Sequence, residues 1–265
     1  MVWTLRISGH VLIGLLAFSA SSWGQEESVD RSVTQPTEQE TEGTSLLRDI
    51  GSDLSHFFTA RESYVILGVG LGSSAVLHPL DDRIIESRLN GERFQGSGLD
   101  LAFETGEVLG GAMVQFGGAL ATYGIGKVSG QSEVAELGRD LLRAQLLSSG
   151  VTQLLKYTVR RTRPDGSSRA SFPSGHASGT FASAAVLHRR YGLKVGAPAM
   201  AVASYVAASR MSENKHHLSD LVFGAAIGLA AGRVVTIDRG STRFELTPMA
   251  VHGGGGIQVT ALKRR

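Results

Sequence analysis

The chain has 265 residues, 42% of them hydrophobic, with 34 glycines and a formal net charge of +2. This length suits one domain with an added tail, and the hydrophobic fraction exceeds that of disordered chains. A charge so close to balance is untypical of nucleic-acid-binding proteins, so we expect no nucleic acid among the partners. The absence of cysteine excludes disulfides, thiolate nucleophiles and cysteine-ligated metals.

The first 44 residues are predicted to serve export rather than the fold. Residues 1–24 resemble a secretory signal, with Arg6 at the start, an apolar run over residues 11–20 and small residues at the end. An uncleaved anchor helix is the alternative, although the apolar run is short for a membrane span. Residues 25–44 are polar and acidic without apolar periodicity, so we expect a disordered linker there.

Helical periodicity of apolar residues dominates the middle of the chain and predicts an all-α domain over residues 45–237, with about six to seven helices. The predicted helices cover residues 46–61, 63–78, 108–126, 133–157, 174–191, 195–209 and 218–236, with a further short helix within 81–101. Residues 108–126 contain 19 positions without a charge, nearly enough to cross a membrane. Their glycines suit a buried helix of a soluble bundle equally well.

The tail, residues 238–265, has a different pattern. Apolar residues alternate with polar ones on both sides of the glycine run at 253–256, which predicts a short β-hairpin. A phosphate-binding loop is less well supported, because no helix and no Lys-Ser or Lys-Thr follows the glycines.

Three clusters between Lys156 and Asp220 carry residues suited to phosphate chemistry. In the first, Lys156 and Arg163 are two helical turns apart and would share a face if the helix continued to Arg163. Pro164 predicts that the helix ends before it, which would free Arg163 to point into a site. Alternatively, these cations only complement the dipole at a helix end.

The second cluster, Pro173-Ser174-Gly175-His176, precedes a helix rich in small residues. Ser174 is a good N-cap, and the free amides of the first turn can bind a phosphate oxygen that Gly175 leaves room for. His176 is placed to exchange a proton with a bound ester. An ordinary capped helix with an exposed histidine is the alternative.

In the third cluster, Arg210 ends one helix and can offer donors to phosphate oxygens. His216 and Asp220 are one helical turn apart, so the carboxylate can orient the imidazole and leave its other nitrogen as a nucleophile. Spacing alone does not separate His216 from His217. A zinc site formed by these two histidines and Asp220 is a further alternative.

Together the clusters resemble the signature of the type 2 phosphatidic acid phosphatase and vanadium haloperoxidase superfamily. Its Lys, six residues, Arg-Pro is met by residues 156–164, its Pro-Ser-Gly-His by 173–176, and its Ser-Arg, five residues, His, three residues, Asp by 209–220. No signature position departs from the pattern, and the three motifs span about a quarter of the chain.

The resemblance implies a helical bundle with a phosphatase site that uses neither metal nor cofactor. It implies that His216 is the nucleophile, oriented by Asp220, and that His176 is the general acid and then the base. The groups implied to hold the phosphoryl oxygens are Lys156, Arg163, Ser174, Gly175 and Arg210. The resemblance also favours His216 over His217.

The implied reaction is hydrolysis of phosphate monoesters or pyrophosphates through a phosphohistidine, with phosphorylated lipids or a small phosphate ester as substrate. Together with the signal, this predicts a place in the bacterial periplasm or cell envelope, in contact with the membrane or embedded in it. A soluble periplasmic acid phosphatase of broad specificity is the alternative, because the hydropathy is modest. A vanadate-dependent haloperoxidase and a non-catalytic envelope protein are more remote alternatives.

Overall fold

The computed structural model describes residues 38–82, 98–236, 242–251 and 254–263. The predicted signal and most of the predicted linker lie outside these residues, as does most of the short helix expected within 81–101. Contacts along the described chain separate a helical unit from a C-terminal pair of strands.

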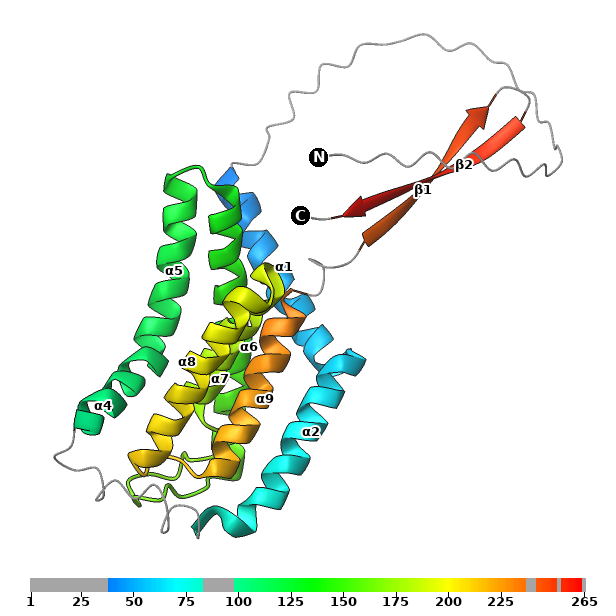
Figure 1. Cartoon of the computed structure of the whole chain (residues 1–265). Helices are drawn as coiled ribbons and strands as arrows, with labels where there is room; N and C mark the ends of the chain where they lie inside the picture. Colours follow the sequence, from blue (N-terminus) through cyan, green and yellow to red (C-terminus); the bar gives the residue numbers. More distant parts are fainter. Residues whose placement is uncertain (1–37, 83–97, 237–241, 252–253, 264–265) are drawn as a thin grey trace. The chain divides into compact units, whose positions relative to one another are not determined.

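The helical unit begins with the long helix α1 and ends with α9 (Figure 1). Its elements are α1 (Glu38–Thr59), α2 (Arg61–Leu77), the 3₁₀ turn η1 (His78–Leu80), α4 (Gly98–Gly110), α5 (Ala112–Val128), α6 (Ser132–Val159), α7 (Gly175–Tyr191), α8 (Leu193–Ser212) and α9 (Leu218–Val234). No described residue between 38 and 236 lies in a strand, which confirms the all-α prediction for this part of the chain.

Two helices differ from the prediction. Helix α1 begins at Glu38, so the end of the expected linker is helical. The single helix expected over residues 108–126 is divided, because α4 ends at Gly110 and α5 begins after Gly111, which has an extended backbone. The two helix axes are bent by 53° at this break. Glycine loses more backbone freedom than any other residue when it enters a helix. Two adjacent glycines therefore favour an interruption of the helix at this point.

Helices α7 and α9 pack at unusually short range. Gly224, Gly228 and Gly232 lie one turn apart along α9, and a Cβ at each would stand 2.2–2.6 Å from a backbone carbonyl oxygen of the Ser174–Ala182 segment. No side chain fits at these positions, so the three glycines let the two backbones approach closely. This contact brings the start of α7 beside the start of α9.

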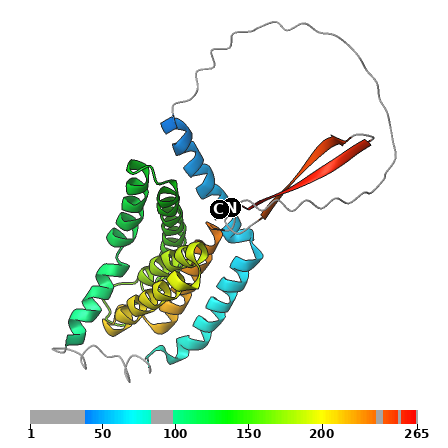
Figure 2. The same cartoon turned by 45° about the horizontal axis from the view of Figure 1, so that its top comes forward.

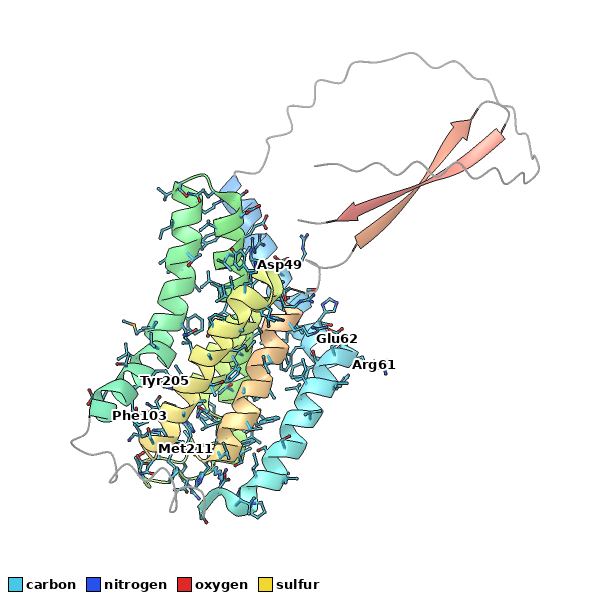
Figure 3. All side chains as sticks on the ribbon, viewed as in Figure 1. Asp49, Arg61, Glu62, Phe103, Tyr205 and Met211 are labelled. Carbon is cyan, nitrogen blue, oxygen red and sulfur yellow. The ribbon has the colours of Figure 1, made fainter. Side chains whose placement is uncertain are left out.

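The core of the unit is built mostly from alanine and β-branched residues of α7 and α9, with Phe57 of α1 and Leu147 of α6 packed against them. Helix α9, which is buried along most of its length, packs against both α2 and α7 (Figure 2). The ends of α2, α6 and α8 and the starts of α7 and α9 lie at one end of the unit (Figure 1). Met211, near the end of α8, marks this end in Figure 3.

The outer helices carry many exposed apolar side chains. On α2, Val69 is 66% and Val76 72% exposed; on α5, Met113 is 89% and Val128 92% exposed. Of the described helices, the segment Arg61–Leu80 has the length and mean hydropathy (1.4) of a membrane span. The bent pair Phe103–Gly110 and Ala112–Val128 passes the same test if it is counted as one span.

The C-terminal strands are β1 (Thr242–Val251) and β2 (Gly254–Lys263). They pair antiparallel, with Leu246 opposite Val259 and Pro248 opposite Ile257.

Candidate active site

The three sequence clusters meet where α6 and α8 end and α7 and α9 begin. The loops at residues 160–174 and 213–217 carry most of the polar groups. Lys215 Nζ lies 2.7 Å from Asp165 Oδ2, and the Asp165 amide donates to the Asn214 carbonyl at 3.0 Å. The two loops are therefore tied together across the site.

His216 and Asp220 form a buried pair. His216 precedes α9 and Asp220 lies in its first turn, so the two do not share a helical turn as their spacing predicted. They nevertheless meet, with 3.7 Å between His216 Nδ1 and Asp220 Oδ2, and both side chains are at most 2% exposed. Since Nδ1 faces the carboxylate, Nε2 is the ring nitrogen left for chemistry.

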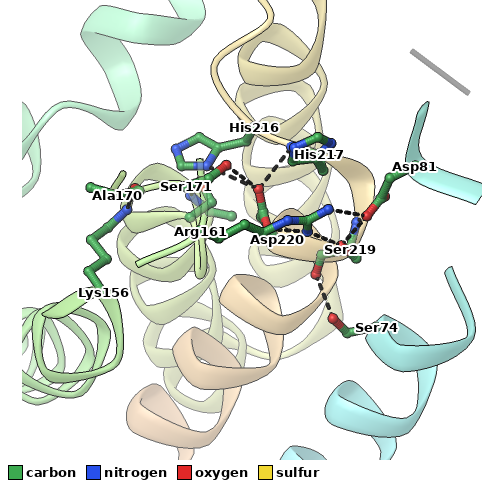
Figure 4. Close-up of polar contacts among 12 residues, drawn as sticks. Ser74, Asp81, Lys156, Arg161, Ala170, Ser171, His216, His217, Ser219 and Asp220 are labelled. Atoms are coloured by element: carbon green, nitrogen blue, oxygen red, sulfur yellow. Dashed lines mark hydrogen bonds and ion pairs between the residues drawn. The ribbon is translucent and has the colours of Figure 1, made fainter. Parts of the chain in front are cut away.

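Asp220 is held by several donors (Figure 4). It accepts hydrogen bonds from the Ser171 hydroxyl, from the His217 amide at 2.9 Å and from Arg161 Nη1 at 2.7 Å. Burial alone would raise the pKa of this carboxyl, but the hydrogen bonds and the Arg161 charge lower the pKa to about 2. Asp220 is therefore ionised at neutral pH.

The His216 imidazole is neutral at neutral pH. Burial lowers its pKa to about 4, and repulsion by Lys156 and Arg163 acts in the same direction, although Asp220 opposes the shift. The first and third clusters also lie close together, since Lys156 donates to the Ala170 carbonyl and the neighbouring Ser171 hydroxyl donates to Asp220. A neutral imidazole with one nitrogen directed at a carboxylate has the form that a histidine nucleophile requires.

His217 has a different place. Its backbone amide donates to Asp220. Among the described residues, Nδ1 of His217 and Nδ1 of His216 are both buried without a hydrogen-bond partner, but Nδ1 of His216 stands 3.7 Å from the Asp220 carboxylate. His217 is the N-cap residue of α9. The geometry therefore pairs the Asp220 carboxylate with the ring of His216.

The second cluster lies at the start of α7, as predicted. Ser174 is the N-cap, its Oγ accepts from the Ala177 amide at 3.4 Å, and α7 begins at Gly175. The Ser174 amide donates to the Asp220 carbonyl at 3.0 Å, which joins the second and third clusters. Burial, followed by the charges of Arg210 and His216, lowers the pKa of His176 to about 4.

The cations of the site are partly buried. Lys156 donates to the Ala170 carbonyl, and burial together with repulsion by Arg163 lowers its pKa to about 8. Helix α6 ends at Val159, so Arg163 lies in the loop and the helical-face argument for this pair does not apply. Within the described residues, the buried Nε of Arg163 has no hydrogen-bond partner.

Arg210, in the last turn of α8, is 4% exposed. Its Nη1 lies 2.5 Å from Glu213 Oε2 and 3.5 Å from Glu107 Oε2. Its Nε is buried and, like that of Arg163, has no partner among the described residues. Buried donors without partners are rare in folded proteins, because each costs desolvation energy.

The residues that support Asp220 were not predicted from the sequence. Arg161 binds Ser219 Oγ at 2.6 Å and Asp81 Oδ2 at 2.8 Å, in addition to Asp220. Asp81 is 1% exposed and also accepts from the Ser219 amide at 3.0 Å. The only sequence signal for Arg161 was its place in a basic run, and nothing in the sequence pointed to Asp81.

The zinc alternative has no geometric support. In the part of the chain that the structure describes, no group of three or more His, Asp or Glu side chains is placed to hold a metal ion. His217 directs its amide rather than its ring toward Asp220, so the three expected ligands do not converge.

Part of the chain that includes this site is similar to known proteins. Residues 138–242 match the PAP2 superfamily, which confirms the resemblance seen in the three motifs. The lipid A 1-phosphatase of Porphyromonas gingivalis is 37% identical over 91 residues, which are 33% of this chain and 20% of that protein. The decaprenylphosphoryl-5-phosphoribose phosphatase of Mycobacterium tuberculosis is 35% identical over 98 residues, 34% of this chain and 54% of that protein.

The chain thus spans between a fifth and about half the length of these curated relatives. Among solved structures, that of Aquifex aeolicus LpxE superposes with a TM-score of 0.49 at 24% identity. The superposition covers 60% of this chain and 93% of that one.

Proposed function

We propose that this chain, with a PAP2-type site, is a phosphatase that hydrolyses phosphate monoesters or pyrophosphates, with lipid phosphates as the favoured class. The observation that carries the proposal is the pair of buried, unpartnered arginine Nε groups beside the His216–Asp220 pair. Both Nε donors lack an acceptor, although Arg210 Nη1 is already paired with Glu213, and a phosphoryl group would supply acceptor oxygens and negative charge to both arginines.

In the first step of the proposed reaction, His216 Nε2 attacks phosphorus and the bond from phosphorus to the leaving oxygen breaks. Asp220 holds the ring through Nδ1 and stabilises the positive charge that the ring gains. The neutral state of His216 at neutral pH supports this role, since a protonated ring has no lone pair for attack. The product of the step is a phosphohistidine.

His176 is proposed to give its proton to the leaving oxygen and then to take one from the water that hydrolyses the phosphohistidine. In the free protein the charge of Arg210 is among the causes that lower the pKa of His176. A bound phosphate dianion offsets that repulsion and raises the pKa of His176, so the ring is protonated more readily in the complex.

Lys156, Arg163 and Arg210 are proposed to hold the phosphoryl oxygens, with the Ser174 N-cap and the amide of Gly175. Phosphoryl transfer depends mostly on positioning and on charge neutralisation. Three cations and a helix N-terminus provide both from groups that are in place before the substrate binds.

Lipid phosphates are favoured because the outer helices of the unit carry exposed apolar side chains. The site lies at the end where α2 ends, and α2 carries Tyr64, Val69 and Val76 in exposed positions. We infer that this surface contacts a membrane and that the protein acts in the bacterial cell envelope after export. Residues 45–237 would then form the catalytic domain, with the C-terminal hairpin as an addition.

The soluble acid phosphatase remains the second candidate, supported by the near-zero mean hydropathy of the whole chain (+0.04). Phosphate release across a panel of lipid and soluble phosphates separates the two candidates. We expect release from lipid phosphates in detergent to exceed release from soluble esters, and His176→Ala to abolish both. If soluble esters are cleaved at least as well as lipids, the lipid preference is wrong; if nothing is cleaved, so is the phosphatase assignment.

A further inference from the structure

A cavity of about 320 Å³ lies beside the proposed site, at the end of α6. It is lined by Gln153, Lys156, Tyr157, Arg160, Arg169 and Ala170. Lys156 is the only proposed phosphate ligand in this lining. Figure 4 shows its side chain extended toward Ala170, and its ammonium group donates to the Ala170 carbonyl.

The charges in the cavity are all positive. Lys156, Arg160 and Arg169 line it, and no lining residue is acidic. Neither arginine forms an ion pair with a carboxylate in the described part of the chain. Arg160 Nε donates to the Tyr157 carbonyl at 3.2 Å, a neutral acceptor. Three cations around a cavity that no acidic residue lines attract an anion.

The backbone at Arg160 supports a role for its side chain. Arg160 caps the C-terminus of α6 in the left-handed conformation, with φ of 50°. Glycine is the usual residue there, because a side chain makes this backbone conformation unfavourable. The chain accepts this cost and thereby places a guanidinium at the rim of the cavity.

Lys156 connects the cavity to the proposed centre. Its ammonium group donates to the Ala170 carbonyl, and the hydroxyl of the next residue, Ser171, donates to Asp220, so Lys156 lies close to the proposed centre. Arg163, His176, Arg210 and His216 do not line the cavity. An anion in the cavity is therefore a neighbour of the phosphate that reacts, rather than that phosphate itself.

We propose that this cavity binds a second phosphate group of the substrate, and that Arg160 and Arg169 make the protein prefer substrates with two phosphates over those with one. The inference rests on the proposed phosphatase function and narrows its substrate class. Tyr157 and Gln153 add hydrogen-bonding groups that suit phosphate oxygens or a nearby sugar hydroxyl.

Kinetics on matched substrates test the preference. One pair is fructose 6-phosphate and fructose 1,6-bisphosphate; the other is phosphatidic acid and phosphatidylglycerol phosphate in detergent. For the double variant Arg160→Gln/Arg169→Gln we expect KM for the two-phosphate substrates to rise about tenfold, and KM for the one-phosphate substrates to stay within about twofold.

An effect in both pairs assigns the cavity to the phosphate itself, and an effect in the lipid pair alone assigns it to a lipid headgroup. Equal changes on one- and two-phosphate substrates, or no change, overturn the inference.

Two controls address charge and folding. Arg189→Gln removes one charge from an exposed position of α7 outside the cavity and should leave the preference intact. Arg160→Gly removes the guanidinium but relieves the backbone cost, so its thermal unfolding temperature should not fall. If Arg160→Gly keeps the full preference for two phosphates, Arg160 has no role in binding.

A binding experiment separates this inference from the proposed reaction. By calorimetry we expect the double variant to bind methylenediphosphonate about tenfold more weakly than the wild type, and methylphosphonate within about twofold of it. If the wild type cleaves nothing yet shows this difference, the phosphatase proposal fails and the cavity assignment stands. Unchanged methylenediphosphonate binding overturns the assignment even in an active enzyme.

Discussion

At the scale of single residues, the two histidines of the site are both neutral in the free protein. Burial lowers the pKa of His176 and of His216 to about 4. The same ionisation state suits one role directly and the other only after substrate binds: a nucleophile needs the neutral ring, whereas a general acid needs the proton. The negative charge of the substrate would therefore raise the pKa of His176 and favour the protonated ring that a general acid needs.

The assignment of the nucleophile predicts a sharp difference between neighbouring residues. His216→Ala should lower phosphate release by at least about 10³-fold, because it removes the attacking group. His217→Ala should retain activity within about tenfold, since the contact from this residue to Asp220 uses its backbone amide. Purified variants assayed for phosphate release, with folding checked by circular dichroism, give the answer. The assignment fails if the two variants exchange places.

The Lys156 ammonium predicts a loss of activity in mild base. Its pKa is lowered to about 8, so the charge is present below this pH and is lost above it. kcat/KM reports the ionisation of the free enzyme and should fall with a midpoint near that pKa. Lys156→Arg keeps a cation at every pH in the assay, so the fall should move upward by at least about 1 pH unit. An unchanged profile in this variant would assign the fall to another group.

Asp81 predicts an effect on turnover from a residue outside the proposed phosphate-binding set. Asp81→Asn weakens the hold on Arg161 and Ser219, and through them on Asp220. We expect kcat to fall about fivefold with KM within about twofold, because the nucleophile is misaligned while the phosphate ligands remain.

The matched control for this variant is Asp140→Asn. Asp140 is equally buried and is also paired with arginine, since Arg190 Nη1 lies 3.0 Å from its Oδ2. Both variants should lose about 1–3 kcal/mol of stability in denaturant unfolding, because each leaves an arginine less well paired. Only Asp81→Asn should lower kcat. An equal fall in both would make Asp81 a purely structural residue.

At the scale of elements, the break between α4 and α5 acts on the site. A Cβ on Gly110, the last residue of α4, would stand 2.5 Å from Val206 Cγ1 and 2.8 Å from His176 Cδ2. The end of α4 therefore packs directly against the imidazole proposed as the general acid. The position of α4 contributes to the orientation of that ring.

Gly110→Ala should therefore displace His176 and lower kcat by about tenfold or more, because small shifts of a catalytic group have large effects on rate. Gly118→Ala is the matched control, since a Cβ there meets no atom within 4 Å. This control should keep its activity and gain up to about 1 kcal/mol of stability from the better helix propensity of alanine. Equal activity in the two variants would show that the contact with His176 has no influence on catalysis.

The helices α6 to α9 followed from the sequence because apolar periodicity and end signals agree there. Ser174 was predicted to cap α7 and does, and α6 ends before Pro164 as expected. The division at Gly110–Gly111 was missed, because the residues on both sides are apolar and no proline or polar cluster marks the break.

The supporting network of the site could not be predicted for a different reason. Local patterns relate residues a few turns apart, whereas Arg161 meets Asp81 across 80 residues and Asp220 across 59. Contacts at such separations depend on how the helices pack. Glycines on α9 allow the close packing of α7, but their role can be recognised only when the partner helix is known. The three motifs predicted the residues of the site, and the fold shows which residues hold Asp220 in place.

At the scale of the whole molecule, the exposed apolar helices predict how the protein partitions. We expect it to stay in the membrane fraction after osmotic shock and after an alkaline carbonate wash. Val69→Lys/Val76→Lys places two charges on α2 and should release a large part of it, since each charge in a bilayer costs about 3 kcal/mol. Leu54→Lys on α1, outside the apolar segment, should release none. Release of the wild type by osmotic shock alone would refute the membrane contact.

The links of Arg161 have a consequence for biosynthesis. During synthesis, Asp81 is added to the chain 80 residues before Arg161, whereas Asp220 is added 59 residues after Arg161. In a growing chain the guanidinium can thus meet Asp81 long before it meets the carboxylate that faces His216. Since the chain emerges from its N-terminus, the reactive pair is the last part of the network to be assembled. A chain that has not yet reached residue 216 therefore contains Asp81 and Arg161 but lacks the proposed nucleophile.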